Sequence, residues 1–190
     1  MRLAVLASGN GSNFEAIAQA VQAGDIPAEI VLLFSDHRDA YVLERAKNNG
    51  IPAGAFELKE FENKKAYEAA LLELLAEHQV DLIVLAGYMR IIGEGLLEAY
   101  PNRIVNIHPA LLPHFPGLHG IKDAYEAKVT ETGVTVHYID SGVDTGPIIA
   151  QEAITVDPEE TLEQLEEKIH QVEHQLYPRV IAEIVKETSK

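Results

Sequence analysis

Short apolar runs alternate with amphipathic segments through the first half of the chain. Continuous apolar centres predict buried strands over residues 3–7, 29–35, 81–86 and 104–107. Apolar positions at helical spacing predict helices between them, over residues 13–23, 39–49 and 63–78. Buried strands that are separated by helices are typical of a parallel sheet with helices on both faces.

The pattern changes in the second half of the chain. Residues 133–140 alternate, with Val134, Val136 and Tyr138 on one face, and residues 148–156 form a further predicted strand. Because alternation indicates strands with two unlike faces, we expect an antiparallel addition to the parallel sheet. The predicted fold class is α/β, with an open, mostly parallel, twisted sheet.

A final helix is predicted to begin at Asp157-Pro158-Glu159-Glu160, which offers a capping residue, a proline and acidic residues for the first turn. Its apolar stripe continues to Leu176, and Pro178 is predicted to kink or divide it. No internal repeat or linker-like composition interrupts the chain. We therefore expect a single domain over residues 1–190.

Charge and cysteine content exclude several classes of function. A formal net charge of −15, with no basic cluster larger than Lys64-Lys65, argues against a nucleic-acid partner. With 0 cysteines, the chain has no disulfide framework and no thiolate nucleophile. No segment approaches the roughly 20 apolar residues that span a bilayer, and the amino-terminal apolar run is too short for a signal peptide. We expect no membrane partner and a cytoplasmic location, while monomer and homodimer both stay open.

A glycine-rich stretch, Ala7-Ser-Gly-Asn-Gly-Ser-Asn13, connects the first predicted strand to the first predicted helix. Glycines let the backbone approach a ligand closely, and free N–H groups at a helix amino terminus attract anions. The stretch lacks the lysine of a P-loop and the glycine spacing of a dinucleotide-binding motif. It therefore suits a single phosphate, and the alternative is a tight turn in which Ser or Asn caps the helix.

Asn106, His108 and Asp144 supply an amide, an imidazole and a carboxylate in strand-end or loop contexts. This set fits acyl transfer, in which one group holds a developing oxyanion, a second moves a proton and a third orients the second. Asp144 lies in a glycine-bounded turn, so it could instead bond its own backbone.

The other histidines give no comparable pattern. His114 is expected to be incidental, and His119 has no assignable role. His137 is expected to be a hydrogen-bonded strand residue, with a supporting role left open. Because His108, His119 and His137 lack the short spacing of metal ligands, no metal site is expected.

Five motifs, taken together, resemble a known family. They are Ser8-Gly-Asn-Gly-Ser-Asn13, Leu85-Ala-Gly-Tyr-Met-Arg-Ile91, Asn106-Ile-His-Pro-Ala-Leu-Leu-Pro113, Phe115-Pro-Gly-Leu-His119 and Gly142-Val-Asp-Thr-Gly-Pro147. In this order they resemble the phosphoribosylglycinamide formyltransferases, the folate-dependent family of purine biosynthesis, over essentially the whole chain. The resemblance implies a Rossmann-like formyltransferase fold. It also implies transfer of the formyl group of 10-formyltetrahydrofolate, as a cosubstrate, to the amine of glycinamide ribonucleotide, with no metal.

The resemblance also implies roles for individual residues. The ribotide phosphate would be held by Gly11, Ser12 and Asn13, and the amine would meet Glu173. The folate pocket would be lined by Met89, Arg90, Ile91, Ile92 and Asn106, with Lys64 facing the glutamate tail. Lys65 is adjacent, so a solvated charged helix face also explains Lys64. The phosphate half would cover about residues 1–100, and the folate and catalytic half about residues 101–190.

The hypothesis for the reaction is that the Asn106 amide and protonated His108 donate hydrogen bonds to the formyl oxygen. Asp144 would oppose the charge of His108 and so favour its protonated form. Either His108 or a water held by Asp144 could carry the proton. Two rivals are a formyltetrahydrofolate deformylase, which shares the Asn-x-His and Asp set, and a non-catalytic phosphosugar-binding module.

Overall fold

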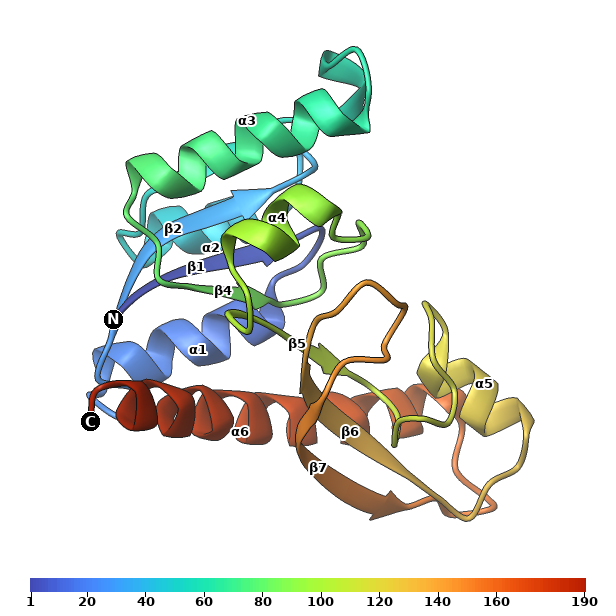
Figure 1. Ribbon diagram of the computed structural model, residues 1–190. Helices are drawn as coiled ribbons and strands as arrows, with labels where there is room; N and C mark the ends of the chain where they lie inside the picture. Colours follow the sequence, from blue (N-terminus) through green and yellow to red (C-terminus); the bar gives the residue numbers. More distant parts are fainter.

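The computed structural model describes residues 1–190 and contains one seven-stranded sheet (Figure 1). The strands are β1 (Arg2–Ala7), β2 (Glu29–Ser35), β3 (Ala53–Ala55), β4 (Leu82–Leu85), β5 (Ile104–His108), β6 (Glu131–Tyr138) and β7 (Ile148–Thr155). Their order is β3-β2-β1-β4-β5-β6-β7. Strands β1 to β5 pair in parallel, whereas β6 and β7 are added antiparallel. This confirms the predicted fold class and the predicted antiparallel addition.

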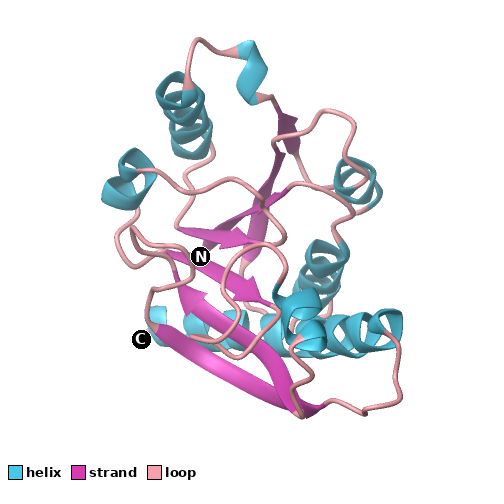
Figure 2. Ribbon diagram, turned by 90° about the vertical axis from the view of Figure 1, so that its right-hand side faces the viewer, coloured by secondary structure: helices cyan, strands magenta, loops and turns pink.

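Helices cover both faces of the sheet (Figure 2). They are α1 (Ser12–Gln22), α2 (Val42–Asn48), α3 (Lys64–Glu77), α4 (Glu94–Ala99), α5 (Gly120–Glu126) and α6 (Leu162–Thr188), with a 3-10 turn η1 at Leu58–Glu60. One face packs mainly against α3 and α4, and the other packs against α1, α2 and α6. None of these helices is both long and apolar enough to cross a membrane.

The sequence of β1 shows why the parallel strands are apolar throughout. Leu3 and Val5 point into the core cluster beneath α1 and α6, whereas Ala4 and Leu6 point into the cluster beneath α3. Successive side chains of a strand face opposite sides of the sheet. Because both sides are covered here, an apolar residue is favoured at every position of the strand.

The last helix begins later than predicted, and of the two effects predicted for Pro178, a kink or a division, the division is wrong. It begins at Leu162, because Thr161 and Gln164 form a reciprocal capping box, with Gln164 N donating to Thr161 Oγ1 and Thr161 N donating to Gln164 Oε1. Residues 157–160 form a preceding turn, in which Asp157 accepts from Glu159 N. Pro178 also does not divide the helix, which is continuous from Leu162 to Thr188. Buried neighbours on both sides of the proline, Tyr177 and Ile181 among them, hold the helix against the sheet.

The strand order changes direction in sequence between β1 and β4, which are neighbours in space. In open parallel sheets such a switch point leaves a crevice outside the carboxyl ends of the strands. The loops that leave β1, β4 and β5 all emerge here, and they carry the motifs at residues 8–13, 86–93 and 108–120.

Tyr177 ties α6 to this part of the sheet. Its fully buried hydroxyl lies 2.7 Å from the carbonyl oxygen of Leu85 on β4 and 3.2 Å from that of Val105 on β5. A single side chain therefore bridges two neighbouring strands close to the site.

Replacing Tyr177 with Phe is expected to lower the free energy of unfolding by about 1–3 kcal/mol, because buried carbonyl oxygens lose their donor. Urea unfolding of the Tyr177→Phe variant measures this change. The control is Tyr41→Phe, since Tyr41 is 54% exposed and removal of its hydroxyl leaves the ring in place. Equal stability of the two variants would contradict a structural role for the Tyr177 hydroxyl.

Candidate active site

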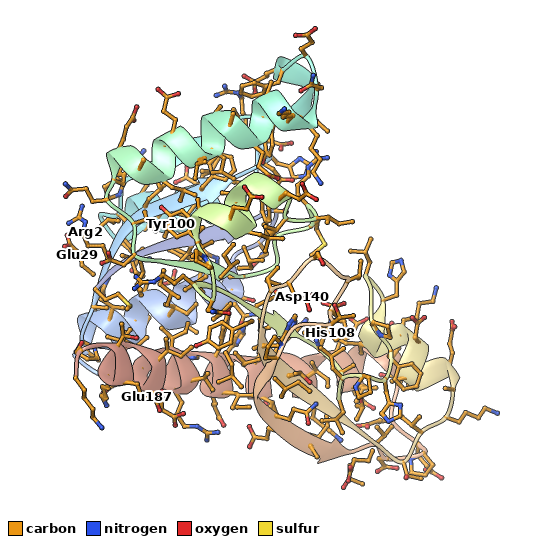
Figure 3. The ribbon with its side chains drawn as sticks, in the orientation of Figure 1. Arg2, Glu29, Tyr100, His108, Asp140 and Glu187 are labelled. Carbon is orange, nitrogen blue, oxygen red and sulfur yellow. The ribbon has the colours of Figure 1, made fainter.

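A cavity of about 440 Å³ lies outside the carboxyl ends of β1, β4 and β5. Figure 3 places His108 and Asp140 at this end of the sheet, opposite Arg2 and Glu29, which lie where β1 and β2 begin. The cavity is lined by residues from the start of α1, the loop after β4, strand β5, the loop between β6 and β7, and α6. The main sequence motifs therefore converge on one place.

The glycine-rich loop forms the entry to α1. Gly11 has a φ of 80°, in the left-handed region, and a Cβ at this position would collide with Val42. No side chain caps the helix, so the alternative of a Ser or Asn cap is wrong. The first N–H groups of any helix lack an intrahelical partner, and those of α1 have no side-chain cap either. They are therefore oriented to receive an anion. Arg45 fixes the loop from outside, with hydrogen bonds of 2.8 Å to the backbone and side-chain oxygens of Asn10.

Two acceptors lie beside this loop, on Asn13 and Glu173. Asn13 Oδ1 is buried and has no hydrogen-bond partner. Glu173 is 6% exposed, and burial raises the pKa of its carboxyl group to about 7, against a smaller lowering effect of the Asn13 side chain. A ligand that donates hydrogen bonds, such as an amine, would satisfy both groups.

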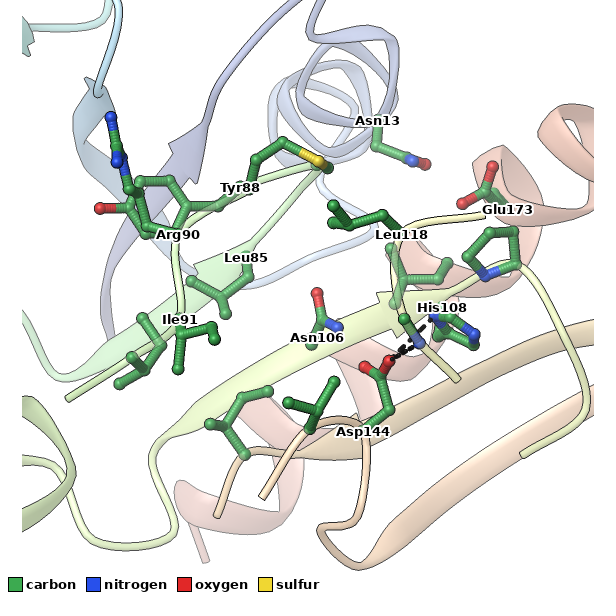
Figure 4. A pocket seen from close by; sticks show the side chains of 18 of the residues that line it. Asn13, Leu85, Tyr88, Arg90, Ile91, Asn106, His108, Leu118, Asp144 and Glu173 are labelled. Carbon is green, nitrogen blue, oxygen red and sulfur yellow. Dashed lines mark hydrogen bonds and ion pairs between the residues drawn. The ribbon is translucent and has the colours of Figure 1, made fainter. Parts of the chain in front are cut away.

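The predicted catalytic residues come together at the middle of the cavity (Figure 4). Asn106 and His108 lie two residues apart on β5, so both point to the same face of the sheet. Asp144 approaches from the loop between β6 and β7, with its Oδ2 atom 3.6 Å from His108 Nδ1. The structure thus confirms that these three groups are neighbours, although their roles stay predictions.

His108 is held from its other side by the loop that follows β5. Its Nε2 atom lies 2.7 Å from the carbonyl oxygen of Phe115, which can only accept a hydrogen bond. Nε2 therefore carries a hydrogen, and Nδ1 is the nitrogen that faces Asp144. Gly120 backs the ring closely, since a Cβ there would come within 3.1 Å of Nε2.

Asp144 is more than a turn residue that bonds its own backbone. Its Oδ2 atom accepts a 2.8 Å hydrogen bond from the backbone N–H of Gly117, which lies in the loop after β5. Its backbone has a φ of 54°, and Phe115 has a φ of 53°. Left-handed backbone at residues other than glycine costs free energy and often marks functional loops. The carboxylate thereby joins the two loops that flank His108.

The segment 89–92 forms the opposite wall of the cavity. It is tied down by three hydrogen bonds: Met89 N to Ser8 Oγ at 2.9 Å, Arg90 Nε to Asp36 Oδ2 at 3.1 Å and Gly93 N to Glu68 Oε2 at 2.9 Å. In Figure 4 the Arg90 side chain points away from Asn106 and the centre of the cavity. Met89 and Ile91 are both more than half exposed, so the wall offers an apolar surface to a flat ligand.

Some predicted residues are not brought to the cavity. Lys64 is exposed at the start of α3 and does not line the cavity, so its proposed contact with a folate tail has no structural support. His114 and His119 are also exposed and do not line it. No group of three or more His, Cys, Asp or Glu side chains is arranged to hold a metal ion.

Sequence reasoning missed three residues that line the cavity, and one that contacts the lining residue Ser12. His170 lines the cavity, and its Nε2 atom lies 3.9 Å from Glu173 Oε1. Its place three residues before Glu173 on α6 could have indicated this, because residues three apart on a helix share a face. His174, on the next turn, forms a 3.1 Å hydrogen bond between its Nε2 and Ser12 Oγ and so joins α6 to the glycine-rich loop. Leu118 and Val143 are exposed apolar residues at the cavity, and only the folded loops reveal them.

Comparison with known proteins agrees with this geometry. Residues 1–181 match the family model described as formyl transferase. The chain belongs to the formyl transferase family. It is 52% identical over 184 residues to the phosphoribosylglycinamide formyltransferase of Bacillus subtilis (strain 168), which covers 97% of this chain and 94% of that protein.

Two further relatives of this formyl transferase are informative. A crystal structure of phosphoribosylglycinamide formyltransferase from Bacillus halodurans superposes with a TM-score of 0.96 at 52% identity, covering 99% of this chain and 97% of that one. The chain is also 43% identical to part of the trifunctional purine biosynthetic protein adenosine-3 of Drosophila melanogaster, covering 99% of this chain and 14% of that protein. Membership of the family implies a folate-derived formyl donor.

The buried carboxyl group of the formyl transferase cavity predicts a dependence of stability on pH. Because burial raises the pKa of Glu173 from 4.5 to about 7, the folded protein keeps a proton that the unfolded chain releases in this window. The contribution of Glu173 to the free energy of unfolding therefore falls as pH rises from about 4.5 to 7, by roughly 3 kcal/mol in total.

A Glu173→Gln variant removes this contribution. Its stability relative to the unmodified protein should rise from pH 4.5 to pH 7, as measured by urea unfolding at several pH values. Glu167→Gln, at an exposed position of the same helix, serves as control and should show no such trend. A difference for Glu173→Gln that is constant with pH would contradict the shifted pKa.

Proposed function

We propose that the protein transfers the formyl group of 10-formyltetrahydrofolate to the amine of glycinamide ribonucleotide, a step of de novo purine biosynthesis. The observation that carries this proposal is the arrangement of one cavity. An amide, an imidazole and a carboxylate lie between a phosphate-binding loop with buried acceptors and an apolar wall. The Bacillus subtilis relative is named as a phosphoribosylglycinamide formyltransferase, and the Drosophila relative is named as a purine biosynthetic protein. Residues 1–190 would work as one domain, with the ribotide held mainly by its first half.

The ribotide end of the cavity would bind a phosphate and an amine. Gly11, Ser12 and Asn13 would hold the phosphate with the unpaired N–H groups at the start of α1. Asn13 Oδ1 and Glu173 would accept hydrogen bonds from the glycinamide amine, which fills the partner missing at Asn13. A carboxyl group whose pKa is raised to about 7 is also suited to take a proton from an ammonium ion near neutral pH.

The folate end would bind a flat aromatic ring. Met89, Arg90, Ile91 and Ile92 would supply its wall, and Leu118 and Val143 would close over it from the two facing loops. Burial of these exposed apolar side chains by the ring would favour binding, at about 25 cal/mol per Å² of apolar surface removed from water. Lys64, which does not line the cavity, is proposed to contact only the glutamate tail of the folate.

The chemical step would occur between the two ends. The amine nitrogen forms a bond to the formyl carbon, and negative charge develops on the formyl oxygen. The Asn106 amide N–H and the N–H of protonated His108 would donate to that oxygen. Because the Nε2–H of His108 already donates a hydrogen bond to the carbonyl oxygen of Phe115, Nδ1 must be the atom that donates to the formyl oxygen.

Collapse of this intermediate breaks the bond between the formyl carbon and the folate nitrogen. The attacking amine loses one proton and the departing folate nitrogen gains one, so the step is balanced. Asp144 lies 3.6 Å from His108 Nδ1, which is an ion-pair distance and not a hydrogen bond. The Nδ1 hydrogen would therefore be available to substrate.

Asn106→Ala and His108→Ala are each expected to reduce turnover by about 100- to 1,000-fold, the usual loss for one oxyanion donor. Both variants should fold and bind both substrates, which calorimetric titration can measure. His114→Ala is the matched control, because His114 is exposed and does not line the cavity. Near-full activity of either site variant would refute its proposed role.

One assay separates transfer from the two rival functions. The protein is incubated with 10-formyltetrahydrofolate, with and without glycinamide ribonucleotide, and release of tetrahydrofolate is followed. Release that requires the ribotide is the expected result. Release without the ribotide would indicate a deformylase, and no release in either mixture would indicate a binding module.

A further inference from the structure

His137 lies against the catalytic group from the neighbouring strand. The antiparallel register of β5 and β6 places it directly opposite Asn106, and its side chain is fully buried. Its Nε2 atom is 3.3 Å from Asn106 Nδ2 and 3.7 Å from Asp144 Oδ1. No substrate-facing role is available to a ring that is enclosed in this way, so its effect must pass through its neighbours.

The hydrogen bonds of His137 determine which of its nitrogens carries a hydrogen. Nδ1 lies 2.9 Å from the backbone carbonyl oxygen of Tyr138, which can only accept, so Nδ1 is protonated. Burial lowers the pKa of His137, and His108 acts in the same direction, against the Tyr138 carbonyl, Asp144 and Asp140, which favour the charged ring. The ring is therefore neutral, and Nε2 presents a lone pair.

A lone pair at Nε2 selects one orientation of the Asn106 amide. The amide nitrogen can donate to Nε2, whereas the amide oxygen would meet it as a second acceptor. One N–H of Asn106 Nδ2 thus donates to His137 Nε2, and the second N–H can donate to a ligand in the cavity that Asn106 lines. In Figure 4 the amide nitrogen lies on the side of His108 and Asp144.

The same lone pair affects Asp144. Its Oδ1 atom finds no donor on His137 at 3.7 Å, and its Oδ2 atom accepts from Gly117 N and faces His108. A neutral His137 therefore leaves Asp144 with Gly117 N as its hydrogen-bond donor and with His108 Nδ1 as its nearest ring nitrogen, at 3.6 Å.

We propose that His137 is a positioning residue, which fixes the side-chain amide of Asn106 so that one N–H points at the formyl oxygen. This inference rests on the proposed formyl transfer, and it assigns the orientation of the oxyanion donor to a residue outside the cavity lining.

Two substitutions separate the two nitrogens of the ring. In His137→Asn the short amide can keep the bond to Tyr138 but cannot reach Asn106. In His137→Gln the longer amide places an oxygen near the former Nε2, where it can accept from Asn106. We expect His137→Asn to lower kcat by about 10- to 100-fold with little change in the KM of either substrate, since a small misplacement of a catalytic group costs up to about 100-fold. His137→Gln should recover a large part of this loss.

A double-mutant cycle tests whether the effect passes through Asn106. In an Asn106→Ala background, His137→Asn should cost less than about threefold more, because the group it orients is already absent. A full additional loss in that background would overturn the proposal, as would equal kcat values for the Asn and Gln variants. His114→Asn controls for replacement of a histidine that does not line the cavity.

A measurement on the unmodified protein keeps the inference testable if the variants do not fold. Two-bond 1H–15N correlation spectra of protein with 15N-labelled histidine report the tautomer of each ring. His137 should be neutral with its hydrogen on Nδ1 at pH 7, and a hydrogen on Nε2 would overturn the proposal. Absence of formyl transfer by the unmodified protein is a different outcome, which would overturn the proposed function while leaving the tautomer measurement intact.

Discussion

Antiparallel pairing between β5 and β6 places the polar groups of the cavity. The register sets Asn106 opposite His137 and His108 opposite Thr135, with all four on one face of the sheet. If β6 slipped by one residue, Val134 and Val136 would turn to this face, and Thr135 and His137 would turn to the apolar core. Thr135 extends the effect, because its hydroxyl donates to Ala110 O at 2.7 Å and accepts from Leu112 N at 3.1 Å. This anchors the chain that returns Phe115 to His108.

Much of the fold could be predicted because apolar patterning is local. The continuous apolar strands, the alternation around Val134 and Val136 and the change from parallel to antiparallel pairing all follow from which faces are covered. Elements that depend on tertiary contacts could not be predicted in this way. Strand β3 has three residues and α4 has six, and both are stabilised by packing and not by their own periodicity. The start of α6 was misplaced because two capping sequences stand close together, and the capping box at Thr161 prevails.

The site was predictable to the extent that its residues lie in sequence motifs. Asn106 and His108 share a strand, so their common face follows from their spacing. The position of Asp144 depends on a loop with left-handed backbone, and that of His170 depends on the packing of α6 beside α1. A charge of −15 also gives no sign of the proposed phosphate site. Attraction for a phosphate would come from unpaired backbone N–H groups at the start of α1, which a count of side-chain charges omits.

Both chain termini lie on the side of the molecule away from the cavity (Figure 1). Strand β1 begins there, and α6 ends there after its last buried residue, Val185. A polypeptide joined at either end would therefore extend from the back of the sheet and leave the substrate entrance open. The same arrangement permits this unit to be embedded in a larger multifunctional chain without any change to its catalytic edge, as the match to one part of the Drosophila protein illustrates.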